Sequence, residues 1–214
     1  NLAESLTGLG DLCRAMYLHG SQWILAAYVG PAYGNFGAPL RLLGLCGVVP
    51  GTLATSLQGP LSRGELRDRR RRVLDALPFV LGLGVLSGLV LAVPARNWLS
   101  LLFPRIPELD AAVRCLRILS GACPAFFAAG LLLPLLLARR EELGVLRVSV
   151  TGLLTLLSIL VAGSPKLEAA AFGLLACEWV VFLGALRAVL RLEASEPRVA
   201  VSEFARNDLM NHAG

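Results

Sequence analysis

Residues 76–95 read ALPFVLGLGVLSGLVLAVPA, twenty consecutive positions that contain no Asp, Glu, Lys or Arg. An α-helix needs about 20 apolar residues to cross the ~30 Å hydrocarbon core of a bilayer, so this stretch by itself predicts a membrane-spanning helix. It is rich in Leu and Gly, and it lacks the strict apolar and polar alternation of a membrane barrel strand. The stretch therefore indicates a helix in lipid rather than a strand.

Outward from this stretch, the chain repeats the same pattern on both sides. Four more runs of at least 18 residues contain none of the four charged residue types, and a sixth run is interrupted only by Glu168, Glu178 and Arg187. The predicted transmembrane helices are 15–40, 42–62, 76–95, 118–138, 148–165 and 167–190, followed by a polar cytoplasmic tail over 192–214.

The overall composition agrees with this pattern. The 214 residues are 56% hydrophobic and 16% charged, whereas soluble proteins average about 25% charged residues. The mean hydropathy is +0.68. A soluble all-α protein needs a polar face on its outer helices, which the second to fifth runs lack. The sequence therefore predicts an all-α polytopic membrane bundle of about six transmembrane helices across residues 1–191.

The basic residues are divided unevenly between the two sets of loops. Twelve arginines fall in the loops after the second and fourth runs and in the tail, against Arg96, Arg105 and Lys166 in the opposite loops. Short loops rich in Arg and Lys stay in the cytoplasm. The first run lacks the charged flank and small-residue cleavage site of a signal peptide, so it is predicted to be a span. We expect a multi-pass protein of the cytoplasmic membrane with both termini cytoplasmic.

Several other classes of function are disfavoured by the same residues. Topology accounts for the arginine runs, so they do not indicate a nucleic-acid partner. The five cysteines show no CxxC spacing and indicate neither a metal site nor a disulfide framework. His19 and His212 are the only histidines, and no nucleophile with a base stands out. The sequence predicts no enzyme activity, no cofactor and no metal, with a membrane enzyme of unrecognised chemistry left open.

Prolines interrupt three of the predicted spans. Pro50 lies inside the second, Pro78 near the start of the third, and Pro124 and Pro134 inside the fourth. Proline removes a backbone hydrogen bond and kinks a helix, which suits a transporter that moves. Membrane helices also tolerate proline generally, so the kinks favour transport only modestly.

Polar groups at membrane depth are costly unless they face a cavity or a partner. Arg114 and Arg117 are three residues apart, so they share a helix face and can hold a doubly charged anion together, or else extend to the outer interface. Glu178 is flanked by about ten residues of apolar helix on each side, where a carboxylate needs a proton, a cation or an arginine. The candidate substrate-binding residues are His19, Gln22, Arg41, Arg114, Arg117 and Glu178.

Three stretches carry a resemblance to a known family. They are GNFGAPLRLLGLCGVVPGTLATSLQGPLSRGELRDRRRRVLDALPF (34–79), AAVRCLRILSGACPAFFAAGLLLPLLLARREE (111–142) and LEAAAFGLLACEW (167–179). Residues 34–79 resemble the second span, basic loop and start of the third span of polysaccharide flippases in the multidrug/oligosaccharidyl-lipid/polysaccharide exporter superfamily. Residues 111–142 resemble the fourth span of that family. Residues 167–179 are similar to the start of its sixth span, which often carries a Glu at the place of Glu178.

The resemblance implies one half of a transporter of twelve to fourteen helices, with another six-helix half in the same full-length chain. The FGAPLRL and LRIL motifs favour assigning these residues to the second of the two halves. The expected function is to flip a lipid-linked saccharide across the membrane by alternating access. A drug or toxin/cation antiporter of the same superfamily and a non-transporting membrane scaffold are the alternatives. His19 and Gln22 stand where family members often carry an acidic residue, so the resemblance does not assign a cation-coupling role to the first span.

Overall fold

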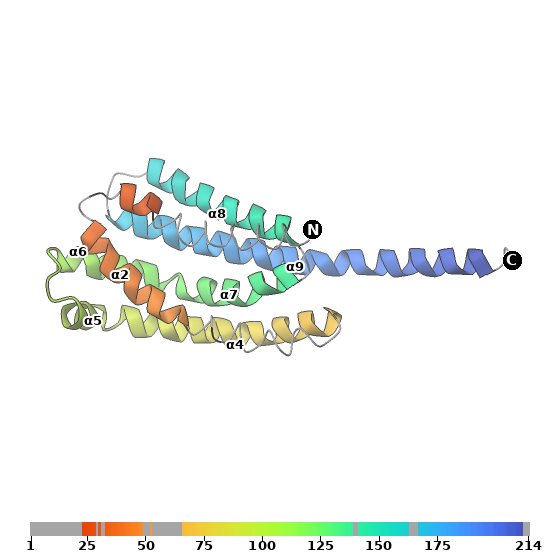
Figure 1. Cartoon of the computed structure of the whole chain (residues 1–214). Coiled ribbons are helices and arrows are strands. Elements are labelled where there is room, and N and C mark those ends of the chain that lie inside the picture. The colour runs from red at the N-terminus through yellow and green to blue at the C-terminus, as the bar shows by residue number, and fades with distance from the viewer. Residues whose placement is uncertain are drawn as a thin grey trace.

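The structure is a computed structural model that describes residues 23–28, 30, 33–48, 52, 66–138, 141–162 and 167–211. Within these ranges the regular structure is helical and contains no strand (Figure 1). The helices are α2 (Tyr33–Cys46), α4 (Leu66–Ala92), α5 (Ala95–Leu102), α6 (Leu109–Ser120), α7 (Cys123–Ala138), α8 (Glu142–Ala162) and α9 (Leu167–Asn211).

Three continuous segments of the described residues are long and apolar enough to cross a membrane. They are Arg70–Ala92, Leu143–Ala162 and Leu167–Arg191. The pair α6 and α7 makes a fourth if it is counted as one span with a 45° bend. The chain is therefore a helical, membrane-embedded protein, as the sequence predicts. The first two predicted spans, 15–40 and 42–62, lie partly outside the described residues, so the count of six spans remains a prediction.

The N-terminal boundary between two predicted spans differs from the structure. The sequence places the boundary between two spans at Arg41, whereas α2 runs unbroken from Tyr33 to Cys46 with Pro39 inside it. Gly and Pro in this stretch indicate a loop when read by sequence alone. Inside a packed membrane protein both residues are tolerated within a helix, because neighbouring helices help to satisfy the freed backbone groups.

Other helix ends also depart from the predicted spans. Helix α4 begins at Leu66, inside the predicted basic loop, and α9 continues through the predicted polar tail to Asn211. Hydropathy marks where a helix leaves lipid, but a helix satisfies its own backbone and can continue into water. The predicted span 118–138 is broken, because α6 ends at Ser120 and α7 begins at Cys123.

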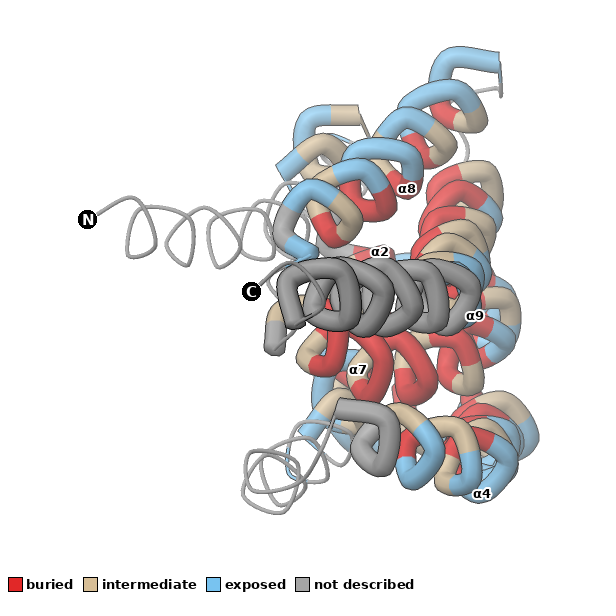
Figure 2. Tube along the Cα trace, turned by 90° about the vertical axis from the view of Figure 1, so that its right-hand side faces the viewer, coloured by how far each residue is buried: buried red, intermediate tan, exposed pale blue. Residues whose placement is uncertain are grey.

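The helices form a layered bundle with α7 near its centre. Figure 1 shows α4, α7, α9 and α8 side by side in that order, with α2 crossing α6 at one end. Buried residues concentrate along α7 (Figure 2), including Phe127, Leu132 and Leu136. This central position explains why α7 is apolar on every side, since each face contacts another helix.

Helix α4 has one face towards α7 and one face outward. Its buried positions recur every three or four residues, which places them on a single face of the helix. Its exposed residues include the large apolar side chains Phe79, Val85, Leu86, Leu89 and Val90. An outward face of this kind is typical of a helix in contact with lipid.

Two glycines let α4 approach the break between α6 and α7. A Cβ atom added at Gly84 would lie 2.6 Å from the Cα of Pro124, and one added at Gly88 would lie 2.6 Å from the backbone oxygen of Ser120. Both obstacles are backbone atoms, which cannot move aside as a side chain does. The two glycines, four positions apart, therefore allow a close helix contact within the chain. Membrane helices associate through such close packing because lipid provides no hydrophobic driving force between them.

We expect Gly88→Ala to destabilise the protein by roughly 1 to 3 kcal/mol, the usual range for overpacking a tight contact. The measurement is unfolding of the purified protein in detergent, by heat or by a denaturing detergent. Gly82→Ala is the matched control on the same helix, because a Cβ added at Gly82 meets nothing within 4 Å. Equal stability of the two variants would contradict the close contact.

The exposed residues Glu108 and Glu141 provide a test of orientation, since their connections lie at opposite ends of the bundle (Figure 1). In a background with the native cysteines replaced, we expect Glu108→Cys to react with an impermeant maleimide added to intact cells. Glu141→Cys should react only after the membrane is opened, because the arginine asymmetry places its loop in the cytoplasm. The reverse labelling pattern would overturn the predicted orientation.

Candidate functional site

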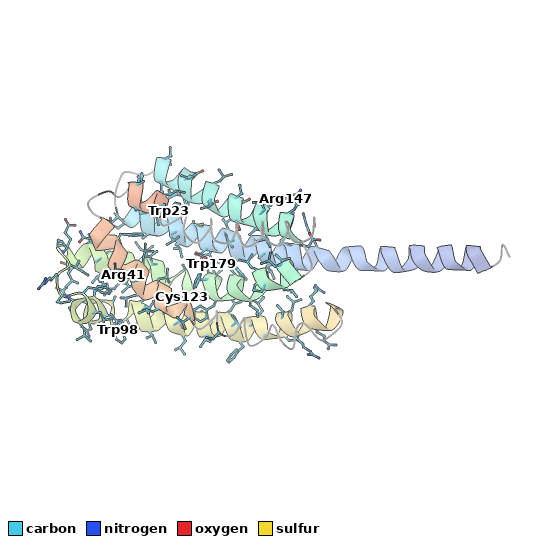
Figure 3. The ribbon with its side chains drawn as sticks, in the orientation of Figure 1. Trp23, Arg41, Trp98, Cys123, Arg147 and Trp179 are labelled. Carbon is cyan, nitrogen blue, oxygen red and sulfur yellow. The ribbon has the colours of Figure 1, made fainter. Side chains whose placement is uncertain are left out.

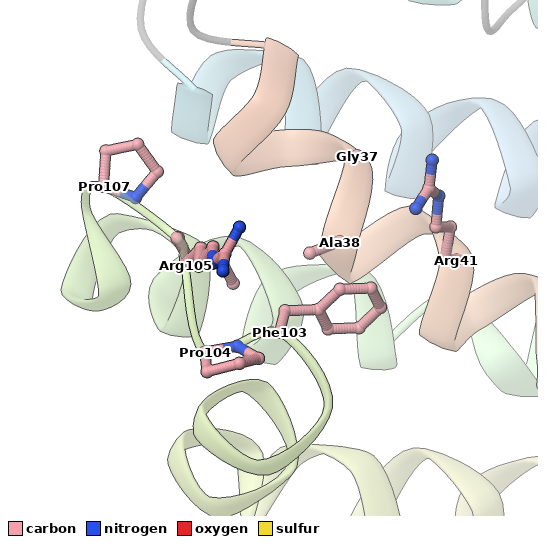
Figure 4. A pocket seen from close by; sticks show the side chains of 8 residues that line it. Gly37, Ala38, Arg41, Phe103, Pro104, Arg105 and Pro107 are labelled. Carbon is pink, nitrogen blue, oxygen red and sulfur yellow. The ribbon is translucent and has the colours of Figure 1, made fainter.

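A groove opens where α2 crosses the connection between α5 and α6. It has a volume of about 460 Å³. Its lining residues are Gly37, Ala38, Arg41, Phe103, Pro104, Arg105, Ile106 and Pro107 (Figure 4). Small residues of α2 form one wall, while the opposite wall is an irregular segment between two helices. The groove therefore depends on segments about sixty positions apart in the sequence.

Two arginines line this groove from different elements. Arg41 projects from α2 and Arg105 from the connection, and both side chains are exposed (Figure 4). Pro104 and Pro107 restrict the backbone on either side of Arg105, because the proline ring fixes φ. No carboxylate is among the lining residues, and the remaining side chains are apolar. The combination of two arginines and apolar walls suits an amphiphile with an anionic headgroup.

The broken helix lies deeper in the bundle than the groove. Gly121 and Ala122 donate backbone hydrogen bonds to the carbonyls of Ile118 and Leu119 at 3.1 and 2.9 Å. These are i to i−3 bonds, and they pair two of the carbonyl oxygens that the last turn of α6 would otherwise leave without a partner. Pro124 follows in the first turn of α7, where a missing N–H does little harm.

Side chains also form hydrogen bonds to backbone carbonyls at the break. The indole Nε1 of Trp179 on α9 donates a hydrogen bond to the carbonyl oxygen of Gly121 at 3.1 Å. The hydroxyl of Ser120 donates to the carbonyl of Arg117 at 2.7 Å. Figure 3 shows Trp179 and Cys123 midway along the bundle. At the 45° bend there is thus one side-chain hydrogen bond within α6 and one from α9.

Glu178 lies beside this break, near the middle of the apolar part of α9. Its side chain is 7% exposed, which makes it one of the few buried charged or polar residues of the described chain. The next residue along the chain, Trp179, donates the hydrogen bond to Gly121 at the break. The structure therefore places Glu178 inside the bundle rather than on the lipid face.

The predicted arginine set is distributed over different surroundings. Arg41 lines the groove, whereas neither Arg114 nor Arg117 does. The Nε of Arg114 forms an exposed ion pair with the carboxylate of Glu168 on α9 at 2.9 Å. Arg117 is exposed on α6. A role of Arg114 and Arg117 in holding an anion together remains a prediction. His19 and Gln22 lie outside the described residues.

Sequence patterns miss two contributors to these sites. They place Arg105 only in an outer loop. The prolines at 104 and 107, which indicate an ordered connection, are the signal that could have identified it. They do not single out Trp179, because an aromatic residue in an apolar helix has no pattern that reveals a distant backbone partner. Its bond to Gly121 spans 58 positions.

Comparison with known proteins yields no relative for this chain. No family model, no curated protein and no solved structure matches it. The resemblance to polysaccharide flippases therefore rests on its short motifs alone.

Proposed function

We propose that the chain is part of a membrane transporter that moves a lipid-linked saccharide across the cytoplasmic membrane by alternating access. Its chemistry is binding and release, and no bond is broken. The observation that carries the proposal is the groove whose lining combines Arg41 and Arg105 with apolar residues. The flippase motifs in the sequence support the same substrate class.

The chemistry of the groove fits this substrate. A lipid-linked saccharide joins an apolar chain to a sugar through a phosphate or diphosphate. Arginine presents several N–H groups in a planar fork that matches phosphate oxygens, and such charge-assisted bonds are among the strongest in proteins. The apolar side chains of Phe103 and Ile106 suit the first carbons of the lipid. Both requirements of an amphiphile are thus met in one groove.

The break between α6 and α7 is a candidate hinge. Helix α6 packs against α2, and α2 carries Arg41 into the groove. A change in the bend between α6 and α7 would move the groove relative to the α7 and α9 core. Hinges of this kind form at helix ends where a few residues absorb the change in backbone angle. A second half of the transporter in the full-length chain, as the resemblance implies, would complete the central cavity.

Replacing Arg41 or Arg105 by Ala should weaken binding of a prenyl diphosphate in detergent by about ten- to a hundredfold in Kd, as expected for loss of a bond to a charged group. Lys at either position should restore binding only in part, because an ammonium group keeps the charge but loses the bidentate fork. Titration of the purified, folded variants with a fluorescent prenyl diphosphate measures both effects.

Arg96→Ala is the control for this experiment. Arg96 is an exposed arginine at the same end of the bundle, and it forms an ion pair with Asp110 at 3.1 Å outside the groove lining. Its replacement should leave Kd unchanged. Equal Kd values for the wild type and for the Ala variants of Arg41 and Arg105 would remove the groove from the proposed function, and would favour a non-transporting scaffold.

A second candidate function is a cation antiporter of the same superfamily, and buried Glu178 favours it. A carboxyl group in the middle of an apolar helix is suited to carry a proton or a cation. If it does so, Glu178→Gln should reduce transport in proteoliposomes and abolish its dependence on pH, at unchanged protein level. Transport that keeps the wild-type rate and pH profile would leave Glu178 a packing residue.

A further inference from the structure

The end of the bundle opposite the groove carries a separate group of exposed arginines. They are Arg71 and Arg72 at the start of α4, Arg147 near the start of α8, and Arg187 and Arg191 near the end of the apolar part of α9. The sequence distributes them over 120 positions. The antiparallel packing of α8 on α9, with α4 beside α7, brings their helix ends to one end of the molecule (Figure 1).

Arg147 and Arg187 emerge at matching depth on neighbouring helices. Val148 of α8 lies against Gly184 of α9, where a Cβ would meet the Val148 side chain at 3.0 Å. Arg147 precedes this contact by one residue, and Arg187 follows it by three. Because the two helices are antiparallel, both arginines lie just beyond the contact on the same side. Figure 3 shows Arg147 at that end of α8, away from Arg41.

Apolar side chains surround these two arginines on the outer surface. Exposed Leu143 and Val150 flank Arg147 along α8, and exposed Leu183 and Leu190 flank Arg187 along α9. A guanidinium that starts within an apolar band extends along its own methylene chain to reach polar surroundings. At the edge of a bilayer it meets the ester carbonyls of the lipids and then their phosphates, which carry the negative charge.

The charge at this end is not neutralised by the described protein groups. Among the described side chains, Arg71, Arg72, Arg147, Arg187 and Arg191 make no ion pair and donate no side-chain hydrogen bond. The exposed carboxylates described at this end are those of Asp75 and Glu141. Among the exposed side chains that the structure describes at this end, five guanidinium groups thus stand against two carboxylates, next to a lipid-facing surface.

We propose that these five arginines, the cationic collar, form a binding surface for anionic phospholipids, with Arg147 and Arg187 as its deepest phosphate contacts. Anionic leaflets attract basic residues beside a membrane helix, and the attraction adds for each arginine. The interleaved apolar side chains favour a lipid over a soluble acidic partner, because they require hydrocarbon beside the phosphate. The proposal does not depend on the proposed transport function.

The test measures retention of added lipid on the purified full chain by native mass spectrometry. The wild type should retain phosphatidylglycerol in preference to phosphatidylcholine, and high salt should reduce the preference. Arg187→Gln should lower the apparent affinity for phosphatidylglycerol about fivefold, and Arg147→Gln with Arg187→Gln more than tenfold. Arg187→Lys keeps the charge and should retain most of the preference.

Arg96→Gln at the opposite end is the matched control and should change nothing at the cationic collar. If the glutamine variants do not fold, the comparison of the two lipids on the wild type still decides the matter. Equal retention of both lipids by the wild type would overturn the proposal and leave the arginines as simple interface anchors. Binding of a nucleic-acid probe without lipid, lost in Arg187→Gln, would also overturn it.

Discussion

Every backbone amide that enters the hydrocarbon core of a membrane must find its hydrogen-bond partner within the protein, because lipid offers none. Helices meet this requirement along most of the described chain. At Gly121 and Ala122 the helix is interrupted, and the requirement has to be met in another way. Short backbone bonds end α6, and the Trp179 indole from α9 satisfies the exposed carbonyl of Gly121. The remaining packing is arranged around this repaired break.

The break in turn determines which residues can sit beside it. Gly84 and Gly88 face Pro124 and Ser120, since any Cβ there would collide with backbone. Because α7 departs from α6 by 45°, α6 leaves the line of α7 and packs against α2 as well as against α9 and α4. The groove with Arg41 and Arg105 forms at this outer corner. The break between α6 and α7 thus creates both the candidate binding groove and a candidate hinge for its motion.

The arginines at the two ends of the bundle have different surroundings. At the groove end, Arg96 and Arg114 are occupied by Asp110 and Glu168, which leaves Arg41 and Arg105 to line the groove. At the other end, the arginines of the cationic collar lie beside lipid-facing leucines and valines. The same residue type is therefore suited to ion pairing, headgroup recognition or membrane attachment, according to what surrounds it.

The sequence alone determined that the chain is an all-helical membrane protein, because apolar runs of spanning length have few other solutions. It also identified Glu178 as an unusual carboxyl group, since a charge in an apolar run is visible without any structure. Tertiary structure decided the rest. Hydropathy cannot show that α2 continues through Arg41 or that α6 ends at Ser120, because helix ends depend on packing and hydrogen bonds as well as polarity. Nor could spacing show that Arg41 shares a groove with Arg105 while Arg114 pairs with Glu168. Those partners are joined only by the crossing of distant helices, which no local pattern records.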